Sequence, residues 1–228
     1  MAVLLCIETS TEICSVTLSE HHRILAQEES NEGNSHAEKL VPFIDNVFKK
    51  AALPIEKIDA VCISEGPGSY TGLRIGVSTA KGLCFALHKP LIAVSTLQAM
   101  AWGAKEQFPD VACYCPLIDA RRMEVYCAVF DNELQIIEPI QNKIITTETF
   151  KEIIEKQSIV FSGNGLDKCK DVLWQHPNRL FADTNISARY LIALAHKKYE
   201  QQLFEDLAYF EPFYLKEFIA GKAHVKGL

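Results

Sequence analysis

Two carboxylates and a glycine-rich loop are the features of this sequence that could support chemistry. Glu8 and Asp119 each stand at the end of a short apolar run, at equivalent places in the two halves of the chain. Carboxylates that meet across a cleft could bind a metal–nucleotide or exchange protons. Residues at the end of a strand also anchor turns, so both interpretations of this pair remain open.

The loop at residues 65–72 reads Glu-Gly-Pro-Gly-Ser-Tyr-Thr-Gly and joins an apolar run to a helical pattern. Glycines allow a sharp turn and a close approach, and a strand–loop–helix junction can direct free amides at a phosphate. However, Gly66, Gly68 and Gly72 miss the dinucleotide fingerprint by one residue, and no Gly-Lys-Ser/Thr follows as in a P-loop. Phosphate binding and a purely structural turn are therefore both hypotheses for this loop.

Other catalytic and metal-binding patterns are missing from the sequence. The seven histidines form no H-x-x-x-H or H-E-x-x-H motif, and there is no G-x-S-x-G nucleophile elbow. His36 is followed four residues later by Leu40, so we expect a lone surface or capping histidine. The eight cysteines include no C-x-x-C pair, and we expect them to be reduced thiols.

Charge and hydropathy restrict the classes of function. A formal net charge of −6 argues against a broad phosphate-binding surface. The tail after Pro212 is a local exception, because it holds Lys216, Lys222 and Lys226 but a single acidic residue, Glu217. There is no apolar run of about 18 residues, and the first residues lack a basic region and reach an acid at Glu8. We therefore expect no membrane span, no signal peptide and a cytoplasmic protein.

The hydrophobic pattern predicts a mixed α/β protein of two lobes, residues 1–100 and 101–228, with the boundary near residues 96–110. Ser35 and Glu38 suggest a capping box for the first helix, and residues 204–228 read as irregular. Strands are predicted at residues 3–8, 14–19, 24–29, 58–64, 91–95, 115–118, 124–130, 136–139 and 158–162. Helices are predicted at 36–52, 72–88, 96–108, 147–155 and 188–202.

The first two predicted helices have unusual faces. In the second, Gly72, Gly76 and Ala80 recur every four residues, and a glycine inside a helix costs about 1 kcal/mol relative to alanine. Such a row allows close packing, either on the protein's own sheet or on another chain. The first helix carries an apolar stripe that looks wider than a sheet requires, formed by Leu40, Phe43, Ile44, Val47, Phe48 and Ala51. A broad internal core and a partner surface both remain possible.

Several segments together resemble the bacterial TsaB family, also called YeaZ. They are residues 7–10 (Ile-Glu-Thr-Ser), 35–36 (Ser-His), 65–76 (the glycine-rich loop and the helix start), 118–121 (Ile-Asp-Ala-Arg) and 212–216 (Pro-Phe-Tyr-Leu-Lys). The resemblance covers essentially the whole chain, and residues 65–76 are its most specific part. It implies an actin-like fold of two related lobes, as in sugar kinases and Hsp70-type ATPases.

The resemblance also implies partners. TsaB proteins bind a homologous catalytic subunit, TsaD, which the ATPase TsaE joins, and the complex transfers a threonylcarbamoyl group to the adenosine beside the anticodon of tRNAs that read codons starting with A. The TsaB–TsaD contact is a bundle of the two N-terminal helices of each subunit, which correspond here to residues 36–52 and 72–88. The implied partner-binding residues are His36, Leu40, Phe43, Val47, Leu73, Ile75, Gly76, Thr79, Ala80 and Leu83. We expect the isolated chain to form a homodimer through the same face, and tRNA to be reached only through the complex.

Departures from related ATPases imply that this chain does no chemistry alone. The H-x-x-x-H metal motif of TsaD is reduced to His36, and the phosphate motifs of actin-like ATPases are altered. Positions of a vestigial nucleotide site would be Glu8, Thr9, Ser10, Gly66, Gly68 and Asp119. We therefore predict a scaffold with no metal, no cofactor and no catalytic residue. A nucleotide-dependent ATPase or transferase is the alternative, and a peptidase is a weaker one because no nucleophile–base pair can be named.

Overall fold

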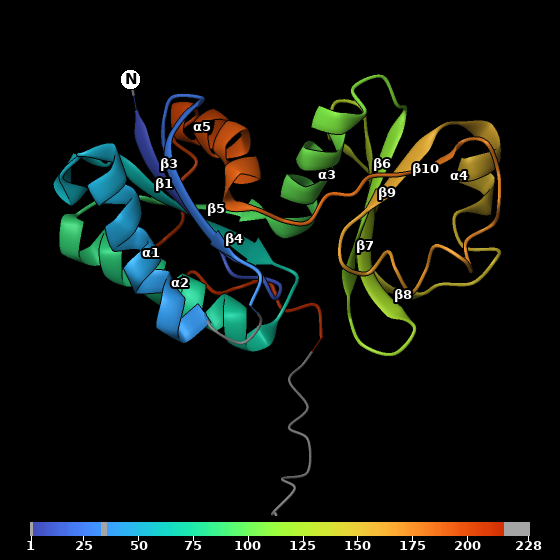
Figure 1. Cartoon of the computed structure of the whole chain (residues 1–228), viewed down its shortest axis with the longest axis horizontal. Helices are drawn as coiled ribbons and strands as arrows, with labels where there is room; N and C mark the ends of the chain where they lie inside the picture. The colour runs from blue at the N-terminus through green and yellow to red at the C-terminus, as the bar shows by residue number, and fades with distance from the viewer. Residues whose placement is uncertain (1, 33–35, 217–228) are drawn as a thin grey trace, which may run out of the picture.

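The computed structural model describes residues 2–32 and 36–216 and contains two five-stranded mixed sheets with helices packed on them (Figure 1). The first sheet has the order β3-β2-β1-β4-β5. Its strands are β1 (Val3–Glu8), β2 (Cys14–Glu20), β3 (Arg23–Ser30), β4 (Ala60–Gly66) and β5 (Leu91–Ser95). Strands β1, β2 and β3 form an antiparallel meander, and β4 and β5 continue the sheet in parallel.

The second sheet repeats this topology. Its order is β10-β9-β6-β7-β8, which read in the opposite direction matches the first sheet strand for strand. Its strands are β6 (Cys113–Asp119), β7 (Glu124–Asp131), β8 (Ile136–Ile144), β9 (Ile159–Ser162) and β10 (Arg179–Phe181). Again an antiparallel meander is continued by parallel strands. Glu8 and Asp119 end the equivalent strands β1 and β6, as the sequence predicted.

Alternation along the strands separates three apolar layers. Leu5 and Ile7 of β1 face α1 (His36–Ala51) and α2 (Tyr70–Leu87) on the outer side of the first sheet. Leu4 and Cys6 face a central cluster that includes α3 (Thr96–Gln107) and residues of both sheets. The outer side of the second sheet packs on α4 (Lys151–Lys156).

The chain crosses back to the first lobe near its C-terminal end, which corrects the predicted division at residue 100. The 3-10 turn η2 (Ala188–Leu191) and α5 (Ile192–Glu200) pack against the first sheet, and Lys198 Nζ donates to Ala93 O at 2.6 Å. Further along, Glu205 pairs with Leu91 of β5. Residues 101–228 therefore do not form one lobe, because η2, α5 and Glu205 lie against the first sheet (Figure 1).

Several predicted elements differ in extent. Strand β8 reaches Ile144, α4 begins only at Lys151, and the predicted helix at 188–202 divides into η2 and α5. Strand β10 and the 3-10 turn η1 (Ile55–Lys57) were not predicted. The capping box of Ser35 lies outside the described residues. Within the residues that the structure describes, no helix combines the length and the apolar character that crossing a membrane requires.

Candidate functional site

The glycine-rich loop packs against the segment that follows β1. A Cβ atom at Gly68 would lie 2.3 Å from Ser10 O, and one at Gly72 would lie 2.1 Å from Thr9 O. Two hydrogen bonds hold the segments together, from Ser69 N to Ser10 O at 2.6 Å and from Thr9 Oγ1 to Gly72 O at 2.8 Å. The glycines are therefore needed for the contact of two backbone segments, which supports the structural interpretation of this loop.

The amides at this junction are already used within the chain. Ser69 caps α2 by accepting from Gly72 N at 3.3 Å through its hydroxyl, and its carbonyl accepts from Leu73 N at 2.9 Å. Gly66 N donates to Thr96 Oγ1 at 3.1 Å. Since a phosphate cradle depends on amides that are free to donate, these bonds favour a structural role for the loop over phosphate binding.

The two candidate carboxylates have different surroundings. Glu8 has no exposed surface, and its Oε1 accepts from Ser10 N at 2.5 Å. Burial raises the pKa of Glu8 to about 6, although the hydroxyls of Ser10 and Ser64 favour the charged form. Asp119 is exposed and forms an ion pair with Lys168. Glu8 is therefore closed off from solvent, whereas Asp119 faces solvent and is bound by Lys168.

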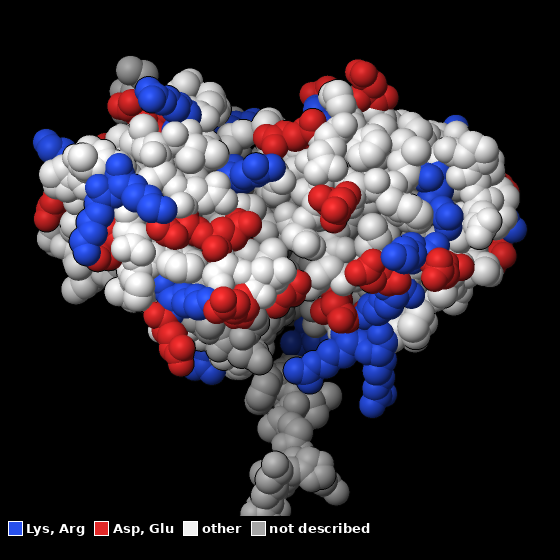
Figure 2. All heavy atoms as spheres, in the orientation of Figure 1, with Lys and Arg blue, Asp and Glu red and all other residues white. Residues whose placement is uncertain are grey.

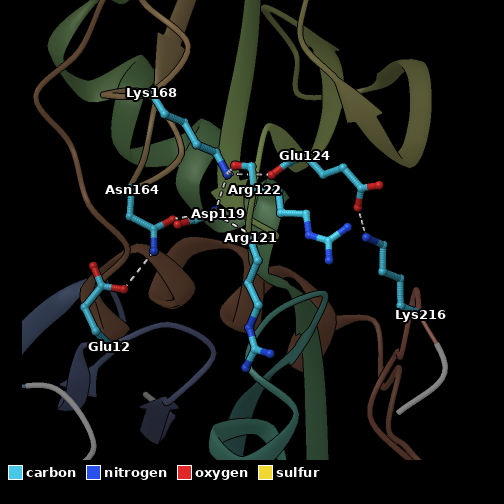
Figure 3. A network of polar contacts seen from close by, with 8 residues as sticks. All are labelled: Glu12, Asp119, Arg121, Arg122, Glu124, Asn164, Lys168 and Lys216. Carbon is cyan, nitrogen blue, oxygen red and sulfur yellow. Dashed lines mark hydrogen bonds and ion pairs between the residues drawn. The ribbon is translucent and has the colours of Figure 1, made fainter. Parts of the chain in front are cut away.

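A polar network joins the two lobes where the equivalent strands β1 and β6 end (Figure 3). Glu12 Oε2, from the first lobe, accepts from Asn164 Nδ2 at 2.7 Å, and Asn164 Oδ1 accepts from Asp119 N at 3.0 Å. Lys168 binds Asp119 and also donates to the carbonyl oxygen of Glu124 at 2.7 Å. Asp119 thus takes part in a polar network that reaches both lobes.

The second candidate surface is the outer face of α1 and α2. An apolar hollow of about 340 Å³ lies there, and its lining residues are Val41, Ile44, Asp45, Phe48, Ile55, Thr79 and Leu83. Val41, which lines the hollow, is 62% exposed, and Phe85, elsewhere on α2, is 76% exposed. Large apolar side chains that are so exposed, next to an apolar hollow, are typical of a surface that binds another protein.

The structure corrects part of the predicted partner surface. Five of the residues are buried in the chain's own core, where they cannot contact a partner directly: Leu40, Val47, Leu73, Gly76 and Ala80. The row of small residues in α2 packs on the first sheet, since a Cβ at Gly76 would lie 2.2 Å from Thr9 Oγ1. The partner hypothesis is left with Phe43, Ile75, Thr79 and Leu83, which are partly exposed.

His36 is also buried, contrary to the expected surface or capping position. Its Nε2 lies 2.8 Å from Thr11 O, so the ring joins the start of α1 to the segment after β1. The sequence analysis missed Val41 and Phe85, which now define the exposed face. Phe85 could have been found, because it is an aromatic residue of α2 that lies outside the row of Gly72, Gly76 and Ala80.

The repeated topology and the layered arrangement define the class of protein: this is an actin-like fold of two related lobes. An activator of 2-hydroxyisocaproyl-CoA dehydratase from Clostridium difficile superposes with a TM-score of 0.54 at 10% identity, over 90% of this chain and 98% of that one. A ROK family protein from Streptococcus pneumoniae superposes with a TM-score of 0.52 at 7% identity, over 88% of this chain and 99% of the other. These likenesses show the fold alone.

Closer relatives identify the family. The model of the TsaD family, described as tRNA N6-adenosine threonylcarbamoyltransferase, matches residues 23–223. The tRNA threonylcarbamoyladenosine biosynthesis protein TsaB of Haemophilus influenzae is 30% identical over 96% of this chain and 95% of its own length. YeaZ from Pseudomonas aeruginosa superposes with a TM-score of 0.83 at 27% identity, over 94% of this chain and all of that one. The chain belongs to the TsaB family, which confirms the family and the fold expected from the sequence.

Proposed function

We propose that this chain is a non-catalytic subunit that binds and supports a TsaD-type catalytic subunit during synthesis of threonylcarbamoyladenosine in tRNA. A TsaE-type ATPase joins the two, and the modified base is the adenosine beside the anticodon of tRNAs that read codons starting with A. Membership of the TsaB family supports the pathway. The observation that supports a non-catalytic role is the packing of the glycine-rich loop. The backbone of Thr9 and Ser10 occupies the space directly against Gly72 and Gly68.

The partner surface that we propose is the outer face of α1 and α2. Val41 lines the apolar hollow, Phe85 is exposed on α2, and Phe43, Ile75 and Leu83 are partly exposed on the same two helices. Burial of such side chains stabilises a complex by about 25 cal/mol per Å² of apolar surface, before the costs of association. In the absence of the catalytic subunit, the same face pairs with a second copy and forms a symmetric dimer. The tRNA is held mainly by the assembled complex, which acts in the cytoplasm.

Reconstitution of the modification reaction tests this proposal. The catalytic subunit, the ATPase and the donor synthase are incubated with tRNA, ATP, threonine and bicarbonate, with or without this chain. We expect modification to require the chain, and Phe85→Glu to abolish both modification and co-elution with the catalytic subunit. Ile144→Glu is the matched control, because Ile144 is 61% exposed on β8 of the second lobe. Modification without the chain, or equal loss in both variants, would count against the proposed role.

Calorimetry with ATP and magnesium tests separately the proposal that the chain is non-catalytic. Because Glu8 is buried and Asp119 is bound by Lys168, the isolated chain should release no heat of nucleotide binding at micromolar concentrations. Micromolar binding would favour the nucleotide-dependent enzyme instead.

A further inference from the structure

The tip of the β6–β7 hairpin carries two consecutive arginines in an unfavourable backbone conformation. Arg121 and Arg122 have φ angles of 69° and 50°. Side chains larger than those of glycine, asparagine or aspartate rarely adopt this left-handed region, and tight hairpins prefer Asn-Gly there. A hairpin that keeps two arginines at these positions gives up stability, and such local strain is typical of sites with a function.

Hydrogen bonds from neighbouring groups fix the backbone of the hairpin tip. Lys168 Nζ donates to the carbonyl oxygens of Arg122 and Glu124 at 2.8 and 2.7 Å, and Arg121 N donates to Asp119 Oδ1 at 2.8 Å. Ala120 N closes the hairpin by donating to Glu124 O at 3.1 Å. The backbone is therefore fixed by contacts that do not use either guanidinium group.

The charges around the tip leave the two arginines available. Asp119 is paired with Lys168, and Glu124 is paired with Lys216, so both nearby carboxylates are already neutralised. Arg121 and Arg122 are exposed, and within the described parts of the chain neither guanidinium has an ion pair or a hydrogen bond. Figure 2 shows basic side chains gathered at the lower edge of the second lobe. The tip thus presents two free positive charges on a protein whose net charge is −6.

We propose that the hairpin tip at Arg121 and Arg122 binds the phosphate backbone of an RNA. Guanidinium groups match phosphate oxygens with two parallel hydrogen bonds. Both residues stand on an exposed tip rather than in a hollow, whereas small ligands are bound in concave sites. An extended polyanion can contact both arginines without being enclosed. The choice of RNA as the polyanion rests on the proposed function, in which the substrate is a tRNA.

This contact is a local addition to a complex and does not make the chain a strong RNA binder. Two phosphate contacts release few counterions, so binding is weak at physiological salt and becomes measurable when the salt concentration is low. The proposal therefore revises the expectation that tRNA is reached only through the complex: the complex still holds most of the tRNA, and the hairpin tip adds one weak direct contact.

The test uses the full chain without its partners and a labelled, unmodified tRNA transcript, titrated at about 50 and about 200 mM salt. The informative variant combines Arg121→Asn with Arg122→Gly, which places the preferred residues in the left-handed positions. We expect its affinity for tRNA at the lower salt to fall at least about tenfold, and its salt slope to decrease by about 2. Its melting temperature should rise, which separates the loss of binding from misfolding.

A control pair removes the same charge elsewhere: Lys156→Gln with Lys197→Gln, at exposed positions of α4 and α5. This pair should retain the wild-type slope. Equal affinities and slopes in the two double variants would overturn the proposal, as would undetectable binding by the wild-type chain at the lower salt. Heat of ATP binding that is lost only in the variant with Arg121→Asn and Arg122→Gly would also overturn it, because it would assign the tip to a nucleotide. The tRNA titration contains no partner protein, so a negative result there does not contradict the proposed role in the complex. A negative reconstitution result likewise does not contradict direct tRNA binding by the hairpin tip.

Discussion

Replacement of Glu8 by glutamine should make the stability of this protein less dependent on pH. Glu8 has no exposed surface, and burial raises its pKa from 4.5 to about 6. The folded chain therefore keeps a proton on this carboxyl between these two pH values, whereas the unfolded chain releases it. The resulting stabilisation is fully present below about pH 4.5 and is lost as the pH rises through about 6.

The magnitude follows from the two pKa values. The difference between a pKa of 4.5 in the unfolded chain and about 6 in the folded chain corresponds to about 2 kcal/mol, since each pKa unit corresponds to about 1.4 kcal/mol. Glutamine carries no charge at any pH, and its Oε1 can still accept from Ser10 N. The wild type should therefore lose about 2 kcal/mol relative to Glu8→Gln between pH 4.5 and 7.5. Any constant cost of the amide group cancels in this comparison.

Denaturant unfolding at pH 4.5, 6 and 7.5 measures the difference directly, with the wild type and the variant in the same buffers. Glu133→Gln serves as the control, because Glu133 is exposed and its replacement changes the net charge by the same amount. We expect its difference from the wild type to stay constant across the range. A constant difference for Glu8→Gln as well would refute the reasoning, because it would show that burial does not perturb this carboxyl.

Two further predictions concern packing and a second titrating group. Gly76→Ala should destabilise the chain by about 1–3 kcal/mol in denaturant unfolding, because the added Cβ would lie 2.2 Å from Thr9 Oγ1. Gly82→Ala in the same helix has no atom within 4 Å of the new Cβ and should stabilise by about 0.5–1 kcal/mol; equal signs would contradict the assigned faces. His196 is 2% exposed, and burial, followed by the charges of His21 and His22, lowers its pKa to about 4. The folded chain keeps this ring neutral, so stability should fall as the pH drops from about 6.5 toward 4, and His196→Gln should reduce that fall in melting curves.

The sequence predicted the fold well because strands and helices leave local periodic signals. The equivalence of Glu8 and Asp119 could be read directly, since each ends an apolar run and the two sheets have the same topology. Local patterns carry no information on which sheet a helix covers. Residues 188–202 show a helical pattern, yet only the packed structure places α5 on the first lobe, through contacts such as Lys198 with Ala93 O.

The row of small residues in α2 is a second case in which a local pattern does not identify the packing partner. A row of small residues indicates that another segment approaches closely, but it does not say which one. The structure identifies that segment as residues 9–10 of the same chain, against Gly72, Gly76 and Gly68. The remaining candidate surface consists of larger side chains on the opposite side of the helix, of which Phe85 is the most exposed.

These contacts also give the glycine-rich loop a structural purpose that requires no phosphate. If the loop served phosphate, a Cβ at Gly72 would obstruct only a ligand. Here it would lie 2.1 Å from Thr9 O and would displace the backbone that holds the first turn of α2. The position of α2 in turn sets where Phe85 and the apolar hollow lie on the surface. The loop therefore acts on partner binding through the placement of a helix, so a substitution at Gly72 should weaken partner binding even though no atom of the loop belongs to the proposed contact surface.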